Sequence, residues 1–144
     1  MTLKAPEHWR RTLIAYLAAL TLSVPWYLAQ RSEKVQPSVS GMVIEVVDGD
    51  TIEVSGLGTV RFVGVNAPEK GEPGSQEAVD FLSKICLGKM VLVDIDDESP
   101  RDTYGRILGV VYLNGTNINA ELLRRGLAEI LYLPPSEFDP SSWE

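Results

Sequence analysis

The chain has 144 residues, 44% of them hydrophobic, and a formal net charge of −7 at pH 7, and this length suits one domain with a single core. Its single cysteine, Cys86, excludes an internal disulfide, and its single histidine, His8, lies near the N-terminus. The rest of the chain therefore lacks the histidine that a Ser-His or Cys-His pair needs, and it cannot form a zinc site from histidine and cysteine.

The N-terminal part contains 19 consecutive residues without a charge, Thr12 to Gln30. A helix of that length reaches roughly the ~30 Å of a bilayer core at ~1.5 Å per residue. We expect an uncleaved membrane anchor, because the run has no polar face and because Trp26 and Tyr27 lie near one end of it. The alternatives are a buried soluble helix and a cleaved signal peptide, although Tyr27 is bulky for a cleavage site.

The charges that flank this run indicate its orientation. Lys4, Arg10 and Arg11 precede the run, whereas Arg31 and Lys34 follow it. The larger positive charge favours a cytoplasmic N-terminus and a domain outside the cytoplasm. The expected organisation is a cytoplasmic stub and anchor at 1–30, a polar linker at 31–40 and a domain at 41–144.

Strand patterns begin directly after the linker. Residues 42–47 and 51–56 read as two strands that flank Asp48-Gly49-Asp50, and Asp-Gly between such segments indicates a hairpin. Residues 58–65 contain four large apolar side chains and predict a third, largely buried strand. Pro68 ends that strand.

An amphipathic helix is predicted next. Ala78, Phe81, Leu82 and Ile85 fall at i, i+3, i+4 and i+7, so one face of a helix that opens at 72–74 and stops at Gly88 is apolar. Cys86 lies on this helix, and we expect it to pack in the core.

The C-terminal half predicts two further strands, a second helix and a tail. The strands are 89–96 and 106–113, and the helix is 118–126 with Asn117 or Asn119 as its cap. Three prolines after Tyr132 oppose another helix, so we expect an irregular tail held against the core by Phe138 or Trp143. The order is three strands, helix, two strands, helix.

Four short motifs carry the candidate chemistry: VVDGDTIEV, VRFVGVNAPE, DTYGR and NINAELLRRGLAEI. Each alone is weak, but in this order and at these distances they resemble the staphylococcal nuclease family over roughly residues 41–133. The resemblance implies an α+β fold, a five-stranded OB-type β-barrel with two packed helices, which the N-terminal transmembrane helix precedes here.

The resemblance also implies a calcium-dependent phosphodiesterase site. Arg61 and Arg106 match two arginines that hold the scissile phosphate, and Glu69 matches a glutamate that acts as general base. These residue types suit the reaction, because guanidinium groups stabilise the charge that builds on the phosphate oxygens and a carboxylate can orient or deprotonate water.

The remaining matches concern the metal and the nucleotide. Asp50 matches a metal-binding carboxylate. Asn66 stands where the family has a second metal-binding aspartate, and Ala67 offers only its backbone carbonyl. Tyr104 and Tyr132 match two tyrosines beside the nucleotide.

Each of these residues also has a purely structural interpretation. Asp48 and Asp50 can shape the hairpin, and Glu69 can cap the approach to the helix. Arg106 can neutralise an acidic run that is itself more typical of a solvated loop than of a metal cluster; the run comprises Asp94, Asp96, Asp97, Glu98 and Asp102. Arg61 is harder to explain in this way, because an arginine in so apolar a strand needs an anionic partner.

Two features oppose strong nuclease activity. Asn66 brings no negative charge, and affinity for calcium follows ligand charge. From Gly41 onward the chain has eight basic and 18 acidic residues, a formal charge of −10, which repels nucleic acid. Sequence-specific, tight recognition of DNA is therefore not expected.

The sequence leaves two functions open. The first is a membrane-anchored nuclease outside the cytoplasm, or secreted after signal cleavage, that hydrolyses DNA or RNA with little sequence preference and uses Ca²⁺. The second is a catalytically weak or inactive OB-fold module that binds an oligonucleotide or a protein at the membrane surface. No protein partner is inferred, and the preference for DNA or RNA stays open.

Overall fold

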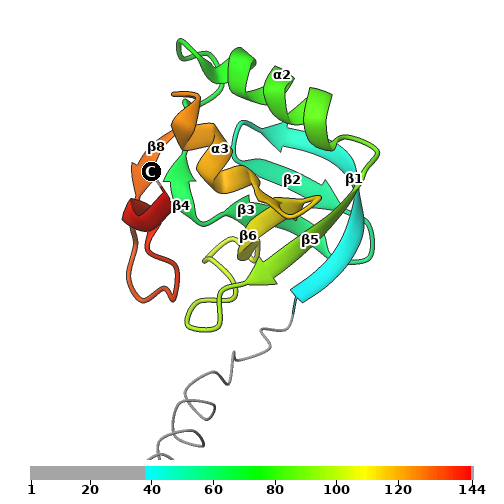
Figure 1. The fold of residues 1–144 in the computed structure, drawn as a ribbon, viewed down its shortest axis with the longest axis vertical. Coiled ribbons are helices and arrows are strands. Elements are labelled where there is room, and N and C mark those ends of the chain that lie inside the picture. Colours follow the sequence, from blue (N-terminus) through cyan, green and yellow to red (C-terminus); the bar gives the residue numbers. More distant parts are fainter. Residues whose placement is uncertain (1–37, 144) are drawn as a thin grey trace, which may run out of the picture. The chain divides into compact units, whose positions relative to one another are not determined.

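Five strands form a closed β-barrel in the computed structural model, which describes residues 38–143 (Figure 1). The strands are β1 (Ser38–Asp48), β2 (Thr51–Val54), β3 (Gly58–Phe62), β5 (Met90–Ile95) and β6 (Ile107–Leu113). Neighbouring strands pair antiparallel except β3 and β6, whose parallel pairing closes the barrel. The five-stranded barrel expected from the sequence is confirmed.

Two helices pack on this barrel, as expected. Helix α2 (Ser75–Cys86) lies across one end, and α3 (Ile118–Arg124) lies beside β6 and β4 (Gly64–Asn66) (Figure 1). The shorter elements are β7 (Thr116–Asn117), β8 (Glu129–Leu131) and the 3₁₀ helix η1 (Pro140–Trp143). The interior of the barrel is filled by alternate strand residues and by the apolar face of α2.

Cys86 lies in this core and is fully buried, so its expected packing role is confirmed. Burial raises the pKa of the thiol to about 11, and the reactive thiolate is therefore scarce near neutral pH.

The hairpin tip between β1 and β2 packs closely against α2 and the segment after β4. A Cβ atom on Gly49 would lie 2.6 Å from the Cβ of Ala78 on α2 and 2.8 Å from the Cβ of Ala67. Only glycine permits this approach. The tip therefore carries Asp50 into a buried position, where it is 7% exposed.

The third predicted strand is broken. Residues 58–65 form β3 and β4 with a bend at Val63, and Gly64 follows it with a φ of 78°. Strand β4 leaves the barrel and pairs antiparallel with β8 in a separate two-stranded sheet. A Cβ atom on Gly64 would lie 3.0 Å from both Pro140 and Trp143, so the bend and the tail fit against each other.

The two ends of the described domain differ in detail from the expected ones. Ser38 to Ser40 belong to β1 and pair with β5, so the strand begins three residues before the expected boundary at Gly41. The tail is irregular apart from η1. Trp143 and Phe138 are both partly buried, and Trp143 packs against the core cluster as expected. The run at 12–30 lies outside the described residues, and within 38–143 no helix is long and apolar enough to cross a membrane.

Asn119 ties α3 to the bend at Val63. It is fully buried; its Oδ1 accepts the N–H of Val111 at 3.0 Å, and its Nδ2 donates to the carbonyls of Val63 at 2.8 Å and Gly109 at 3.2 Å. We expect Asn119→Leu to lower the free energy of unfolding by roughly 2–4 kcal/mol, because the side chain keeps its bulk but leaves buried polar groups without partners. Urea denaturation measures this loss.

The matched control is Asn117, the N-cap of α3, whose Oδ1 accepts the N–H of Ala120 at 2.9 Å. Asn117→Ala removes an ordinary cap and is expected to cost about 1 kcal/mol. If Asn119→Leu lowers the free energy of unfolding no more than Asn117→Ala does, the buried hydrogen bonds of Asn119 do not stabilise the fold as proposed.

Candidate active site

Asp50 is the buried carboxylate at the hairpin tip. Its Oδ1 accepts the hydroxyl of Thr51 at 3.0 Å, and its Oδ2 accepts the backbone N–H of Ala67 at 2.8 Å. The same Oδ2 lies 3.1 Å from Nη2 of Arg61. The carboxylate therefore joins the hairpin, β3 and the segment after β4 at one point.

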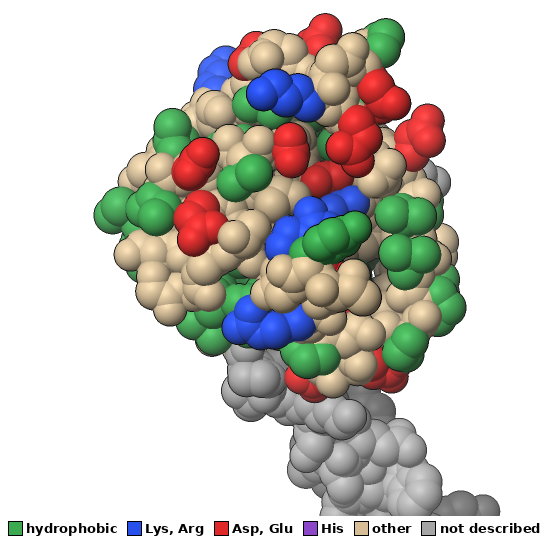
Figure 2. All heavy atoms as spheres, turned by 180° about the vertical axis from the view of Figure 1, so that it is seen from behind, with side chains coloured by type: hydrophobic (Ala, Val, Ile, Leu, Met, Phe, Trp, Pro, Cys, Tyr) green, Lys and Arg blue, Asp and Glu red, His purple; other side chains and the backbone are tan. Residues whose placement is uncertain are grey.

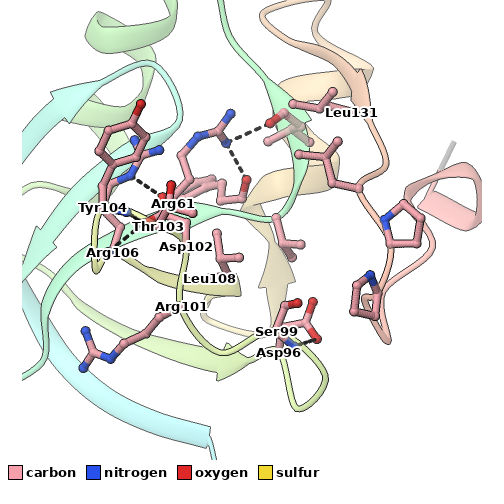
Figure 3. A pocket seen from close by; sticks show the side chains of 17 residues that line it. Arg61, Asp96, Ser99, Arg101, Asp102, Thr103, Tyr104, Arg106, Leu108 and Leu131 are labelled. Carbon is pink, nitrogen blue, oxygen red and sulfur yellow. Dashed lines mark hydrogen bonds and ion pairs between the residues drawn. The ribbon is translucent and has the colours of Figure 1, made fainter.

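Arg61 lies on β3 with its guanidinium inside the β3–β4 bend. Nη1 donates to the carbonyls of Phe62 at 2.6 Å and Val65 at 2.8 Å (Figure 3). Nη2 donates to Oδ1 of Asn66 at 3.1 Å. Burial lowers the pKa of Arg61, while the charge of Asp50 opposes that shift. The anionic partner that the sequence demands for this arginine is Asp50.

Arg106 lies at the end of the turn that precedes β6. Its Nε donates to Oδ2 of Asp102 at 2.7 Å, and its guanidinium lies 5.5 Å from the centre of the Tyr104 ring. Burial would raise the pKa of Asp102, but the hydrogen bonds and charge of Arg106 and the N–H of Tyr104 lower it overall. Arg106 is thus held by a fixed carboxylate and covered by an aromatic ring that is 85% exposed.

Asp102 has a role at the site that was not predicted from the sequence, because there it was only one member of an acidic run. Its Oδ1 accepts the backbone N–H groups of Tyr104 at 3.0 Å and Arg106 at 2.9 Å, so one side chain shapes the turn and orients the arginine. The signal for it was the i, i+4 spacing of Asp102 and Arg106 around Gly105, whose φ is 82°.

Glu69 lies in the exposed turn between Pro68 and α2. Its backbone N–H donates to Oε2 of Glu72, and its carbonyl accepts the N–H of Glu72, both at 2.8 Å. Among the charges that shift the pKa of Arg61, those of Glu69 and Asp102 raise it and that of Arg106 lowers it. The charges of Glu69 and Arg106 therefore act on Arg61 in opposite directions.

The two arginines border one cavity of about 480 Å³. Tyr104 and Asp102 line it on one side and Leu131 lies on the other (Figure 3). The apolar wall of the cavity comprises Leu108, Leu131, Leu133, Pro134 and Pro135. Tyr132 is 48% exposed in the segment after β8 but does not line this cavity. The structure thus places Arg61 and Arg106 on one cavity and Asp50 against Arg61, whereas Asp50, Glu69 and Tyr132 do not line that cavity.

One wall of the cavity is held by Asp96, for which the expectation of a solvated loop is wrong. Asp96 is fully buried, because the tail folds over it. Its carboxylate accepts hydrogen bonds from the Ser136 hydroxyl and from three backbone N–H groups, those of Glu98, Ser99 and Glu137. The carboxylate therefore fixes the tail, including the two prolines of the apolar wall, to the loop opposite.

The oxygen donors near Asp50 suit a hard cation. They are the carboxylate of Asp50, Oδ1 of Asn66 and the carbonyl of Ala67, and calcium prefers such ligands. Among residues 38–143 no group of three acidic, histidine or cysteine side chains is placed to hold a metal. These three oxygen donors are of the chemical type that calcium prefers, but only Asp50 carries a negative charge.

Comparisons with known proteins identify the family of this chain. The family described as staphylococcal nuclease homologue matches residues 59–141, more than half of the chain. An uncharacterized endonuclease of Escherichia coli is 39% identical over 94 residues, which cover 62% of this chain and 60% of the relative. A thermonuclease of Staphylococcus intermedius is 35% identical over 107 residues, covering 68% and 63%. Endonuclease YncB of Bacillus subtilis is 38% identical over 97 residues, covering 60% and 46%. The chain spans about 60% of the length of the first two relatives.

Proposed function

The chain belongs to the staphylococcal nuclease family, and from this membership and the geometry of the cavity we propose that it is a nuclease that hydrolyses phosphodiester bonds of DNA or RNA. The relatives are named as endonucleases and a thermonuclease. The observation that carries the proposal is that Arg61 and Arg106 border a single cavity and that Arg61 forms an ion pair with the buried carboxylate of Asp50 at 3.1 Å.

In this proposal the two guanidinium groups act on the phosphate. Arg106 is held by Asp102 through its Nε and lines the cavity, so its two terminal nitrogens can donate hydrogen bonds to phosphate oxygens. Arg61 already donates to backbone carbonyls, which orients it before substrate arrives. Such preorganised donors stabilise the charge that develops in the transition state.

Glu69 is proposed as the general base. Its carboxylate is exposed to water, and its backbone is fixed by two hydrogen bonds to Glu72. It can therefore take a proton from a water molecule that attacks the phosphorus while the turn stays in place.

Calcium is proposed as the cofactor, held by Asp50, Asn66 and Ala67. When bound there, it would neutralise part of the negative charge on the phosphate. Oδ1 of Asp50 accepts one hydrogen bond from Thr51 and keeps a further lone pair for a ligand bond. Ala67 contributes to this arrangement through its backbone, whose N–H holds Asp50 in place.

Asn66→Asp is expected to lower the calcium concentration for half-maximal activity, because a second carboxylate raises the ligand charge. A calcium titration of the initial cleavage rate measures this. Asn66→Ala is the control and is expected to shift the midpoint in the opposite direction. An unchanged midpoint in both variants would remove Asn66 from the ligand set.

Incubating the full chain with single-stranded DNA or RNA, in calcium or in chelator, tests the proposed function directly. Calcium-dependent cleavage that is lost in the chelator is the expected result. No cleavage at high protein concentration, with an intact fold by circular dichroism, would reject it.

A binding module is the second candidate, and the acidic balance of the domain favours it. Figure 2 shows more acidic than basic side chains on the face opposite the view of Figure 1, with several acidic ones gathered in its upper part, which opposes tight binding of nucleic acid. Tyrosine fluorescence during a calcium titration separates the candidates, because it reports calcium binding and only the nuclease candidate requires calcium for its activity.

We propose further that the uncharged run at 12–30 anchors the protein in a membrane, with the domain outside the cytoplasm. The length of the run and the basic residues before it support this. Extraction by detergent but not by alkaline carbonate is expected of such an anchor; release by carbonate would oppose it.

A further inference from the structure

The outer surface of β1 and β5 carries large apolar side chains that nothing in the described chain covers. Met42 and Ile44 on β1 are 45% and 57% exposed, and Met90 and Leu92 on β5 are 56% and 39% exposed. Met42 and Met90 are direct partners in the antiparallel ladder. These four residues form what we call the β1–β5 apolar face.

The face arises from strand alternation. Val43 on β1 and Val91 and Val93 on β5 are buried in the barrel, so their neighbours point outward. On the outside of a barrel in water, alternate positions normally carry polar side chains. Four apolar ones that adjoin across two strands therefore indicate a surface with a partner.

A shallow hollow of about 340 Å³ extends the face toward β6. Ser40, Leu92 and Tyr112 are in register across the three strands and line it with Met90. None of these residues lines the cavity that holds Arg61 and Arg106, so a partner on the face leaves that cavity accessible.

The position of the face in the sequence suggests its partner. Strand β1 begins at Ser38, and only seven residues, 31–37, separate it from the uncharged run that ends at Gln30. Seven residues span at most about 25 Å when fully extended. If the run is held in a bilayer, β1 and its apolar face are held within that distance of the lipid surface.

We propose that the β1–β5 apolar face rests on the lipid bilayer that holds residues 12–30 and so fixes the orientation of the domain. A few half-exposed side chains bind lipid weakly, but a short tether makes the contact effectively intramolecular and raises its occupancy. The formal charge of −10 from Gly41 onward opposes anionic lipid, so the expected surface is zwitterionic phosphatidylcholine.

The test uses the full chain in phosphatidylcholine vesicles and an environment-sensitive fluorophore on an introduced cysteine. Cys86 is fully buried, with the pKa of its thiol raised to about 11, so it stays unlabelled in the folded protein. Met90→Cys and Ile44→Cys each place the label on the face. Leu133→Cys is the matched control, because Leu133 is also apolar, is 67% exposed and borders the other cavity.

Vesicles with bromine on the acyl chains are expected to quench most of the fluorescence at positions 90 and 44 and little at position 133. Equal quenching at all three positions, or none at 90 and 44, would overturn the proposal. Labels shielded from aqueous iodide yet unquenched by brominated lipid would indicate a second copy of the chain instead. A chain that fails to sediment with the vesicles would also overturn it, and because no readout uses cleavage, the result is independent of the nuclease proposal.

Discussion

Arg106→Ala is expected to lower kcat for phosphodiester cleavage by roughly 10²–10⁴-fold, because a preorganised donor to the transferring phosphoryl group contributes that much. Arg106 is oriented by a 2.7 Å hydrogen bond to Asp102 and borders the cavity beside Arg61. Its guanidinium is bound less completely by the protein than that of Arg61, which donates to two carbonyls and to Asn66. Initial rates on single-stranded DNA at saturating calcium measure the loss.

Arg101 supplies the matched control. It borders the same cavity, but its Nη1 donates to the carbonyl of Gly105 at 2.6 Å, and Figure 3 shows its side chain extending away from Arg61 and Tyr104. Arg101→Ala is expected to change kcat by less than about threefold, because it removes only an exposed surface contact. Equal losses for Arg101→Ala and Arg106→Ala would mean that charge alone matters, and the assigned role of Arg106 would be wrong.

Asp102→Asn separates orientation from charge. The amide oxygen can still accept the backbone N–H groups of Tyr104 and Arg106, but the ion pair with Arg106 is lost. We expect an intermediate loss of kcat, smaller than that of Arg106→Ala, because the guanidinium remains but is less well fixed.

Most of the barrel could be predicted because its signals are local. Asp-Gly between two strand-like segments placed the β1–β2 hairpin, and the helical spacing of Ala78, Phe81, Leu82 and Ile85 placed α2. The parallel pairing of β3 with β6 joins residues more than forty apart, so no local pattern predicts it; the family resemblance predicted a five-stranded barrel but not this pairing.

The elements that were missed depend on distant partners. Strands β4 and β8 have three residues each, too few to show a period, and they pair across the chain. The bend at Val63 is set by Gly64 against Pro140 and Trp143. Asp96 reads as one member of an acidic run, yet its burial is decided by Ser136, forty residues later.

For the candidate site, the residues could be predicted from the sequence, but their hydrogen bonds and ion pairs could not. The motifs singled out Asp50, Arg61, Glu69 and Arg106; in the structure Arg61 contacts Asp50 and shares a cavity with Arg106, while Glu69 lies outside that cavity. The sequence could not show that Arg61 is wrapped by the carbonyls of its own bend, because backbone orientation there depends on the turn at Gly64. The same local geometry explains why an arginine is tolerated in so apolar a strand.

Glu69→Gln is expected to lower kcat by roughly 10²–10⁴-fold with little change in KM, because the amide keeps the size of the side chain but cannot accept the proton of the attacking water. The turn itself is held through the backbone of Glu69, by bonds to Glu72 on both its N–H and its carbonyl. The substitution is therefore expected to leave the melting temperature and the calcium midpoint unchanged. Single-turnover cleavage at saturating calcium measures the chemical step apart from product release.

Glu72→Gln is the control for this variant. Its amide oxygen can still accept the N–H of Glu69, so the turn survives while one nearby negative charge is removed. If Glu69 is the base, Glu72→Gln retains nearly full kcat. A comparable loss in both variants would show that the acidic turn acts through its total charge. Retention of activity in Glu69→Gln would show that another group is the base.

A double variant, Glu69→Gln with Arg106→Ala, tests whether the two residues act on the same phosphate. Two groups that act on one phosphate give a combined loss of kcat smaller than the product of the single losses, whereas independent defects multiply.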